Sequence, residues 1–181
     1  MVTARGGWQS ISPGFRTYKS SAYQVRIDMY DVLELNEEEA WVRVEPLVSM
    51  GQLSHYLLPR GYTIPVIPEM DDLTVGGLLN GVGIETSSHK YGLFNDTVVE
   101  AELVLANGEL VRCSRTENRD LWDALPWSYG TLGFLVSCKI SIIPCAEYVR
   151  IEYRPCFTQH QGTALFTVRP RCLSNTASVA N

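Results

Sequence analysis

Serine, threonine and glycine residues that could bind a phosphate-bearing ligand are concentrated in DDLTVGGLLNGVGIETSSHKYGLF, residues 71–94. The backbone N–H groups of successive glycines bind anions without obstruction by side chains. The hydroxyls of Thr74, Thr86, Ser87 and Ser88 are donors that suit phosphate or ribityl oxygens. The stretch therefore predicts a site for an extended, doubly charged and partly aromatic ligand. The alternative is a glycine-rich connection between a hairpin and a helix.

Two familiar phosphate-binding motifs are excluded on the residues alone. A Walker loop needs a glycine followed directly by lysine and then serine or threonine, and the sequence contains no Gly-Lys pair. A G-x-G-x-x-G dinucleotide motif needs a third glycine, but GVGIET has Thr86 at that position and no βαβ pattern surrounds it. Another way of holding the ligand is required.

Two further glycine-rich turns flank this stretch in the sequence. TARGGWQS, residues 3–10, places Arg5 beside Gly6 and Gly7, and YGTLGF, residues 129–134, places Gly130 and Gly133 before a strand. Three such turns are three ordinary loops if they lie apart. If they converge, they would hold one long cofactor.

The composition limits the class of protein. The chain has 181 residues, 45% of them hydrophobic and 19% charged, which indicates one globular domain with a sizeable core. The net charge of −5 and the lack of a basic run give no support for a nucleic-acid partner. No stretch approaches the roughly 20 apolar residues that span a bilayer, and the first residues do not form a signal-peptide pattern.

The cysteines and histidines do not predict a metal site. No two cysteines form a C-x-x-C pair, and His55, His89 and His160 are widely dispersed. The odd number and apolar neighbours of the cysteines favour reduced, partly buried thiols over disulfides or metal ligands. The five cysteines are Cys113, Cys138, Cys145, Cys156 and Cys172.

Periodicity predicts the elements that position these residues. Alternation predicts strands over 23–29 and 41–46, joined by a solvated loop that includes LELNEEEAW. A helix with Ser49 as its N-cap should end before Gly61, and TVGGLLNG should form a short helix. The clearest signal is a β-hairpin over 98–113 that turns at Asn107 and Gly108.

The remaining sequence predicts a helix, two strands and a tail. A short amphipathic helix over 117–126 stops at Pro126, and strands are expected over 134–143 and 148–155. Residues 156–181 lack a sustained period, so we expect a poorly ordered or foreign tail with a weak strand signal near 164–168.

The glycine stretch strongly resembles the FAD-binding segment of the delta(24)-sterol reductase family. The likeness extends over RVEPLVSMGQ, ELVLANGELVRC, DALPWSYGTLGFLV and KISIIP, and it covers residues 1–155. The family belongs to the vanillyl-alcohol-oxidase (PCMH) type of flavoproteins. The resemblance therefore implies an α+β FAD-binding domain over 1–155, with an incomplete first subdomain and a mixed or antiparallel sheet with flanking helices in the second.

The resemblance also implies which residues contact FAD. TARGGWQS is the counterpart of the pyrophosphate loop, and the flavin and pyrophosphate are expected near the backbone of 74–86. The implied cofactor-binding residues are Arg5, Gly6, Gly7, Thr74, Val75, Gly76, Gly77, Leu78, Leu79, Asn80, Gly81, Val82, Gly83, Ile84, Glu85, Thr86, Ser87, Ser88, His89 and Gly133.

The expected attachment of the flavin follows from one residue. Many members of the superfamily link a histidine after the paired glycines covalently to the flavin, and this sequence has Trp8 there. An indole offers no nucleophilic nitrogen for that bond, so the sequence predicts non-covalent FAD. No catalytic acid is assigned. The side chains of His89 and Tyr91 are of types that can donate a proton, and the alternative is that both brace the flavin loop.

The family's chemistry implies a reductant, a substrate and a location. Its members reduce the side-chain double bond of sterols such as desmosterol, with NADPH as the reductant, and they are anchored in the endoplasmic reticulum membrane facing the cytosol. The chain begins near an internal family pattern close to MCTARPGW and diverges after 155. We therefore expect a piece without the anchor and the substrate domain, able to bind FAD weakly but lacking full reductase activity. The alternatives are an inactive FAD-binding fragment and an FAD-linked oxidase of the same superfamily.

Overall fold

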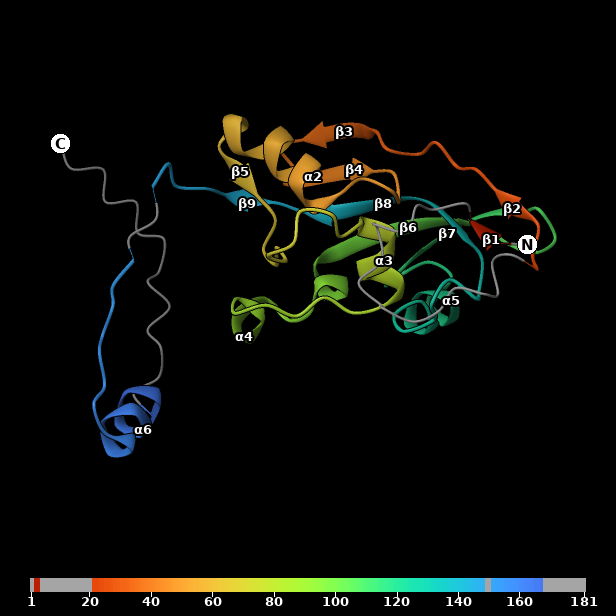
Figure 1. Cartoon of the computed structure of the whole chain (residues 1–181). Coiled ribbons are helices and arrows are strands. Elements are labelled where there is room, and N and C mark those ends of the chain that lie inside the picture. The colour runs from red at the N-terminus through yellow and green to blue at the C-terminus, as the bar shows by residue number, and fades with distance from the viewer. Residues whose placement is uncertain (1, 4–20, 149–150, 168–181) are drawn as a thin grey trace. The chain divides into compact units, whose positions relative to one another are not determined.

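The computed structural model describes residues 2–3, 21–148 and 151–167. The chain divides into two units, 1–144 and 145–181. The larger unit contains all of the sheets and most of the helices (Figure 1). The domain boundary at 155 that the sequence suggests stays a prediction.

A five-stranded antiparallel sheet forms the framework of the larger unit. Its strand order is β3-β4-β8-β6-β7, so β8, which comes last in the sequence, lies in the middle. Each neighbouring pair of strands is antiparallel. The strands are β3 (Val32–Asn36), β4 (Trp41–Val44), β6 (Val98–Val104), β7 (Leu110–Ser114) and β8 (Phe134–Ser141).

The β6–β7 hairpin confirms the strongest local prediction. Gly108 has φ of +83°, a left-handed conformation that glycine adopts without a steric penalty. The Asn107 side chain accepts a hydrogen bond from the Glu109 N–H at 3.0 Å. These two residues close the turn, as an Asn-Gly pair typically does in a short hairpin.

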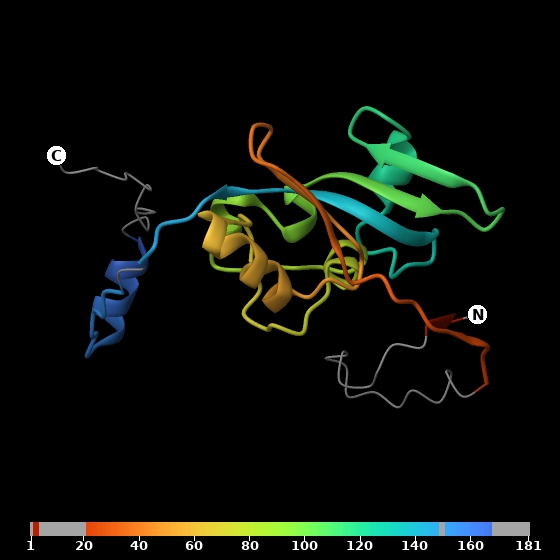
Figure 2. The same cartoon turned by 90° about the horizontal axis from the view of Figure 1, so that it is seen from above.

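Helices α2 (Met50–Leu57) and α3 (Val75–Asn80) lie against one face of this sheet (Figures 1 and 2). Ser49 caps α2 and accepts a hydrogen bond from the Gln52 N–H at 3.1 Å, as predicted. The 3-10 turn η2 (Leu58–Arg60) follows α2 and ends at Gly61. The shorter elements are β1 (Val2–Thr3), β2 (Gln24–Val25), β5 (Tyr62–Thr63), α4 (Ser88–Tyr91), η3 (Phe94–Thr97), α5 (Arg119–Ala124) and β9 (Ile143–Pro144).

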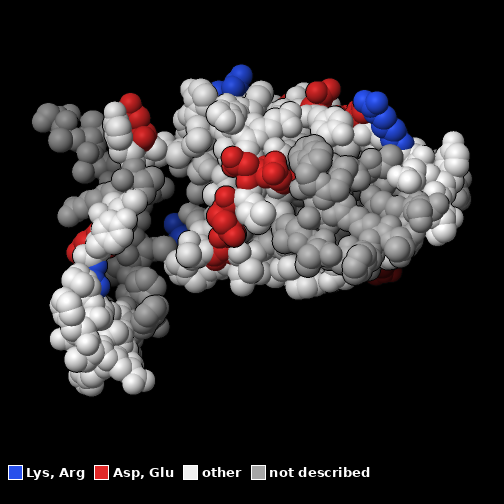
Figure 3. All heavy atoms as spheres, in the orientation of Figure 1, with Lys and Arg blue, Asp and Glu red and all other residues white. Residues whose placement is uncertain are grey.

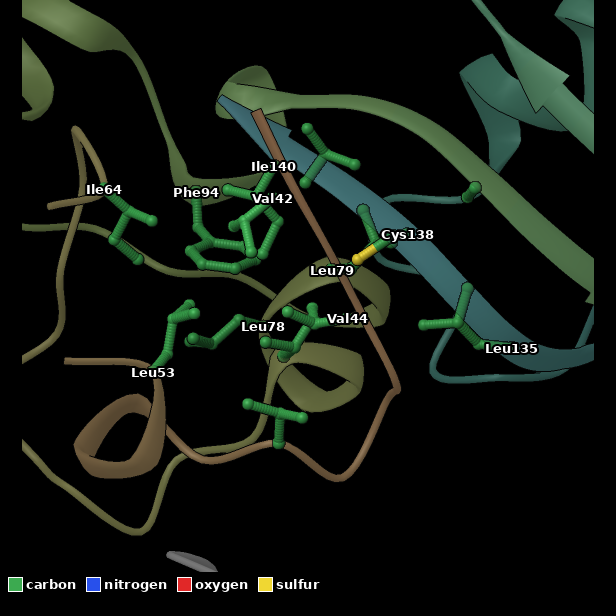
Figure 4. Close-up of a cluster of buried hydrophobic side chains, with 14 of the residues drawn as sticks. Val42, Val44, Leu53, Ile64, Leu78, Leu79, Phe94, Leu135, Cys138 and Ile140 are labelled. Atoms are coloured by element: carbon green, nitrogen blue, oxygen red, sulfur yellow. The ribbon is translucent and has the colours of Figure 1, made fainter. Parts of the chain in front are cut away.

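The hydrophobic core lies between the sheet and the two helices. Phe94 is fully buried at its centre, and Figure 4 shows its ring beside Val42 of β4 and Ile140 of β8. Leu53 of α2 and Leu78 of α3 close the opposite side of this cluster. The core therefore joins the helix that carries the glycine stretch to the central strands.

The other face of the sheet carries a charged network. Arg43 on β4 alternates with the buried residues of that strand and contacts Glu100 at 3.0 Å and Glu102 at 3.1 Å, both on β6. Ser137 on β8 donates a hydrogen bond to Glu102 at 2.7 Å. This bond is the first cause that holds the pKa of Glu102 below its usual range, and the Arg43 charge adds to it. Ion pairs join β4 to β6, and the hydrogen bond from Ser137 joins β8 to the same network.

Acidic side chains also gather on the face of the larger unit shown in Figure 3, with the Lys and Arg side chains apart from them at its margins. The chain as a whole has a net charge of −5. A phosphate bound on such a face would depend on local donors, because the overall field does not attract anions.

Three predictions about the elements need correction. Of the strand expected over 23–29 only Gln24–Val25 forms β2, which pairs in parallel with β1. Part of the expected loop LELNEEEAW is instead strand β3, which pairs with β4 across a tight turn where Ala40 has φ of +57°. The edge position explains the error, since an edge strand exposes apolar residues such as Leu33 and blurs the alternation.

The third correction concerns the smaller unit. Residues 151–155 form no strand, and Ile151 and Tyr153 are exposed there. Residues 159–167, which include most of the weak strand signal, form helix α6 (Gln159–Thr167). Thr158 accepts a hydrogen bond from the Gln161 N–H, and Gln161 accepts one from the Thr158 N–H, a reciprocal cap that favours a helix. Residues 168–181 lie outside the described part.

Candidate functional site

Helix α3 begins with backbone donors that already have partners within the protein. The N–H groups of Val75 and Gly76 donate to the carbonyls of Val48 and Pro46 at 3.0 and 2.8 Å. The Gly77 N–H donates to the Thr74 hydroxyl oxygen at 3.3 Å, so Thr74 is the N-cap of the helix. This first turn is therefore bound to the chain that leads into α2, and an incoming phosphate would have to compete for its donors.

The open donors lie in the loop that follows α3. Within the described residues, no acceptor faces the N–H groups of Val82, Gly83, Ile84, Thr86 and Ser87. Gly83 is buried, and a buried N–H without a partner is costly enough that nearly all native structures avoid it. The loop 82–87 thus presents a run of donors that an anionic ligand would satisfy.

Gly83 also shows why one glycine of the stretch is needed. A Cβ at this position would lie 2.7 Å from the Cβ of Phe94 and 3.1 Å from Leu78 Cδ2. The Gly83 carbonyl accepts a hydrogen bond from the Phe94 N–H at 2.9 Å. The close approach of the loop to the core therefore explains this glycine, without any ligand.

The same loop exposes apolar surface beside its open donors. Val82 is 38% exposed and Ile84 is 68% exposed, although both are β-branched aliphatic residues. The donor set of backbone N–H groups and the adjoining apolar surface fit a ligand that carries both phosphate and a flat ring, as FAD does. The cofactor-binding residues that the sequence proposes between Thr74 and His89 form one continuous segment, which runs from α3 through the loop 82–87 into α4.

The end of the segment is held by short local bonds. Ser88 accepts a hydrogen bond from the Glu85 N–H at 3.0 Å, and His89 Nδ1 lies 2.6 Å from the Thr86 carbonyl. A carbonyl only accepts, so this contact places the proton on Nδ1. Ser87 makes no capping bond through its side chain. His89 therefore braces the loop, one of the two roles that the sequence leaves open for it.

The acidic side chain of Glu85, in this loop, is paired with that of Glu69 from another loop. Partial burial is the first cause that raises the pKa of Glu85, and a hydrogen bond to Glu69 raises it further. The pKa of Glu69 is lowered by its own backbone hydrogen bond and then by the bond to Glu85. The sequence proposes Glu85 as a site residue but does not signal Glu69, because the two belong to separate loops.

Asn80 connects the glycine stretch to the turn at 128–131. The Ser128 hydroxyl donates to Asn80 Oδ1 at 3.2 Å, and the Tyr129 N–H donates to the Asn80 carbonyl at 2.9 Å. Asn80 Nδ2 in turn donates to the Gly76 carbonyl at 2.8 Å. Two of the three glycine turns therefore meet in the fold. The third, with Arg5, Gly6, Gly7 and Trp8, lies outside the described residues.

Gly133 has a reason of its own in the packing. A Cβ there would lie 3.0 Å from the Val104 carbonyl oxygen at the end of β6. The residue lets the 128–133 segment pass close to the sheet before β8 begins. A role of Gly133 toward a cofactor stays a prediction.

A separate hollow of about 350 Å³ lies between α3, η3 and α5. It is lined by Leu79, Asn95, Asp96, Arg115, Arg119, Trp122, Asp123, Leu125 and Pro126. Asn95 Oδ1 is buried without a hydrogen-bond partner among the described residues. The Arg119 and Asp123 side chains form an ion pair at 3.1 Å, so the charges of the hollow are partly balanced from within.

Among the described cysteines, which are free thiols, Cys113 and Cys138 are buried and Cys156 is exposed, and Cys172 lies outside the described residues. Burial raises the pKa of Cys113 to about 11 and that of Cys138 to about 12, so neither is a thiolate at neutral pH. No group of three or more His, Cys, Asp or Glu side chains in the described part could hold a metal ion. No helix in the same part is long and apolar enough to cross a membrane.

Comparison with known proteins relates this geometry to a family. Residues 1–114 match the FAD binding domain family. The chain is 52% identical over 155 residues to the Delta(24)-sterol reductase of Homo sapiens, an alignment that covers 86% of this chain and 30% of the human protein. It is 49% identical over 158 residues to the Delta(24)-sterol reductase of Arabidopsis thaliana, covering 86% of this chain and 28% of that protein. The chain thus spans less than a third of the length of these relatives.

Solved structures show the same fold. The carbohydrate oxidase from Microdochium nivale superposes with a TM-score of 0.62 at 31% identity, covering 67% of this chain and 26% of that chain. The xylooligosaccharide oxidase from Myceliophthora thermophila gives a TM-score of 0.61 at 33% identity, covering 66% of this chain and 25% of that chain. The α+β architecture with an antiparallel sheet and flanking helices is confirmed, and the chain belongs to the FAD binding domain family.

Proposed function

We propose that this chain is the FAD-binding part of a Delta(24)-sterol reductase. The observation that carries the cofactor assignment is the run of N–H groups in the loop 82–87 that have no acceptor among the described residues, beside exposed Val82 and Ile84. The assignment to sterol reduction rests on the 52% identity to the human enzyme, which extends over 86% of this chain.

The residues of this chain would bind and orient the cofactor. The N–H groups of 82–84, 86 and 87 would donate to its phosphate or ribityl oxygens, and the apolar side chains of the same loop would pack against its ring. Hydride transfer is the chemistry that FAD supplies when it is bound. Arg5, Gly6 and Gly7 would complete the pyrophosphate contacts, as the resemblance implies.

The reductant, substrate and location belong to the same proposal. NADPH would supply a hydride to FAD, the side-chain double bond of a sterol such as desmosterol would take up that hydride and a proton, and the protein would act at the endoplasmic reticulum membrane on its cytosolic side. The sequence support is the identity to named sterol reductases. The alignment covers 30% of the human protein, so FAD binding is the part of this proposal that the described residues bear on directly.

The attachment of the flavin is tested by denaturation in acid. Because Trp8 replaces the histidine that forms the covalent link elsewhere in the superfamily, we expect acid to release all of the flavin into the supernatant. A yellow protein pellet would contradict non-covalent binding.

The substrate class is tested by anaerobic reduction of the flavin-loaded chain. Bleaching by NADPH followed by reduction of added desmosterol would support a competent reductase. Bound flavin without sterol turnover would support an FAD-binding fragment. Hydrogen peroxide produced from a sugar or alcohol would favour the oxidase alternative, which the fold similarity to two carbohydrate-acting oxidases keeps open.

A further inference from the structure

We infer that Asn80 is a positioning residue that fixes the 128–131 turn to helix α3, and so shapes the cofactor site through the turn instead of by contacting the cofactor. This inference rests on the proposed FAD binding. It differs from the role that sequence resemblance gives Asn80, which is direct contact with the cofactor. Three hydrogen bonds of Asn80 and the backbone conformation of the turn carry it.

The first observation is that the polar atoms of Asn80 already form hydrogen bonds within the protein. Its Nδ2 donates to the Gly76 carbonyl at 2.8 Å within α3. Its Oδ1 accepts from the Ser128 hydroxyl at 3.2 Å, and its carbonyl accepts from the Tyr129 N–H at 2.9 Å. The side chain therefore bridges two segments that are 48 residues apart in the sequence.

The second observation is that the turn needs such support. Trp127, Tyr129 and Gly130 have φ of +66°, +52° and +74°, so three of four successive residues are left-handed. Only Gly130 adopts this conformation without a steric penalty, so Trp127 and Tyr129 persist there only if their surroundings hold them. Bonds within the turn contribute, since the Thr131 N–H and hydroxyl both donate to the Ser128 carbonyl at 3.1 and 2.7 Å.

The third observation is that the turn exposes two large aromatic side chains. Tyr129 is 76% exposed and Trp127 is 53% exposed, although both carry large rings. Gly133, the predicted cofactor contact of this segment, follows directly and passes close to the Val104 carbonyl. Loss of the Ser128–Asn80 side-chain bond would leave the Tyr129 N–H to Asn80 carbonyl bond as the remaining link to Asn80, and would loosen the backbone that carries these residues.

The test compares three variants of the full 181-residue chain. Asn80→Ala removes both side-chain bonds. Asn80→Asp keeps an acceptor for Ser128 and loses the donor to Gly76. Ser128→Ala removes the bond from the other side, together with the 3.4 Å bond that the Ser128 hydroxyl accepts from the Gly130 N–H. Ser54→Ala is the matched control, because the Ser54 hydroxyl donates to the Met50 carbonyl within α2 and takes no part in the bridge.

The first readout does not depend on flavin. Amide hydrogen exchange of 127–133 should accelerate by about tenfold in Asn80→Ala and Ser128→Ala, the loss that one hydrogen bond typically causes. Asn80→Asp should protect the turn better than Asn80→Ala does. The Ser54→Ala control should leave exchange in the turn unchanged. Equal exchange in all variants and the unmodified chain would overturn the inference.

The second readout is the dissociation constant for FAD, measured by flavin fluorescence. Asn80→Ala and Ser128→Ala should each weaken FAD binding by about tenfold, and the double variant should fall well short of the product of the two losses, because both remove the same Asn80–Ser128 bond. If the two losses multiply, Asn80 contacts the cofactor itself and the inference is wrong. If the unmodified chain binds no FAD, the proposed function fails, and hydrogen exchange still decides the bridge.

Discussion

At the residue scale, the glycine stretch combines close packing with open backbone donors. Gly83 is needed because its backbone lies against Phe94 in the core, where a Cβ would be 2.7 Å from the Phe94 Cβ. The neighbouring N–H groups of Val82 and Ile84 have no acceptor among the described residues. Close packing thus holds the loop in a conformation that leaves donors open, which is how a fold prepares a site before a ligand arrives.

The substitution Gly83→Ala should destabilise the protein. The added methyl group must displace Phe94 or the loop, and overpacking of this kind typically costs about 1–3 kcal/mol in the free energy of unfolding. Urea denaturation monitored by circular dichroism measures it. Gly162→Ala in α6 is the control, since a Cβ there meets nothing within 4 Å. Equal midpoints for Gly83→Ala and the unmodified chain would show that the core has room at this position.

At the element scale, the sheet is held on one face by packing and on the other by charge. Arg43, Glu100 and Glu102 join β4 to β6, and Ser137 of β8 completes the contact with Glu102. These groups are partly buried, with side-chain exposures of 18%, 15% and 19% for Arg43, Glu100 and Glu102, so solvent screens them less than it screens surface pairs. The network therefore favours one register of the central strands.

The substitution Glu102→Gln should destabilise the chain by about 1.5–3 kcal/mol at neutral pH, the range for hydrogen bonds to a charged group. The folded state lowers the pKa of Glu102, so its ionised form contributes stability above the unfolded pKa. That stability is lost as the pH falls through the folded value. The difference between Glu102→Gln and the unmodified chain should therefore shrink in acid.

Urea denaturation at a series of pH values measures this dependence. Glu38→Gln, in the exposed turn between β3 and β4, is the matched control and should have little effect at any pH. A Glu102→Gln difference that stays constant from neutral to acid pH would contradict the role of the ionised carboxylate.

The sequence predicts the elements that depend on local patterns. The β6–β7 hairpin, the Ser49 cap of α2 and the short helix α3 are all found where alternation, capping and turn residues place them. It misses β3, whose half-exposed edge position blurs the alternation. The bridge from Asn80 to Ser128 joins distant segments, and no pattern within either one signals it.

The candidate site is predictable to the same extent. Composition points to the segment 74–89 and suggests that the N–H groups of its glycines donate hydrogen bonds to an anion. Only the structure shows that the first turn of α3 is already bonded to Pro46 and Val48, and that the open N–H groups lie after Gly81. The partner of each N–H is a tertiary fact, because it depends on which distant carbonyl the fold brings near.

At the scale of the whole molecule, the larger unit is a cofactor module that similar proteins carry within longer chains. The chain aligns with 30% of the human Delta(24)-sterol reductase and with 26% of the Microdochium nivale carbohydrate oxidase. One relative is named for sterol reduction and the other for carbohydrate oxidation. The shared module therefore accounts for a common cofactor domain and does not by itself identify a substrate.

The most direct test of the central claim is amide hydrogen exchange of the purified chain with and without FAD. Five N–H groups in the loop 82–87 lack acceptors in the described chain, and a bound cofactor would supply them. We predict that saturating FAD slows exchange in 82–87, with a smaller effect at 128–133. Unchanged exchange in 82–87 under saturating FAD, or protection confined to other segments, would contradict the account.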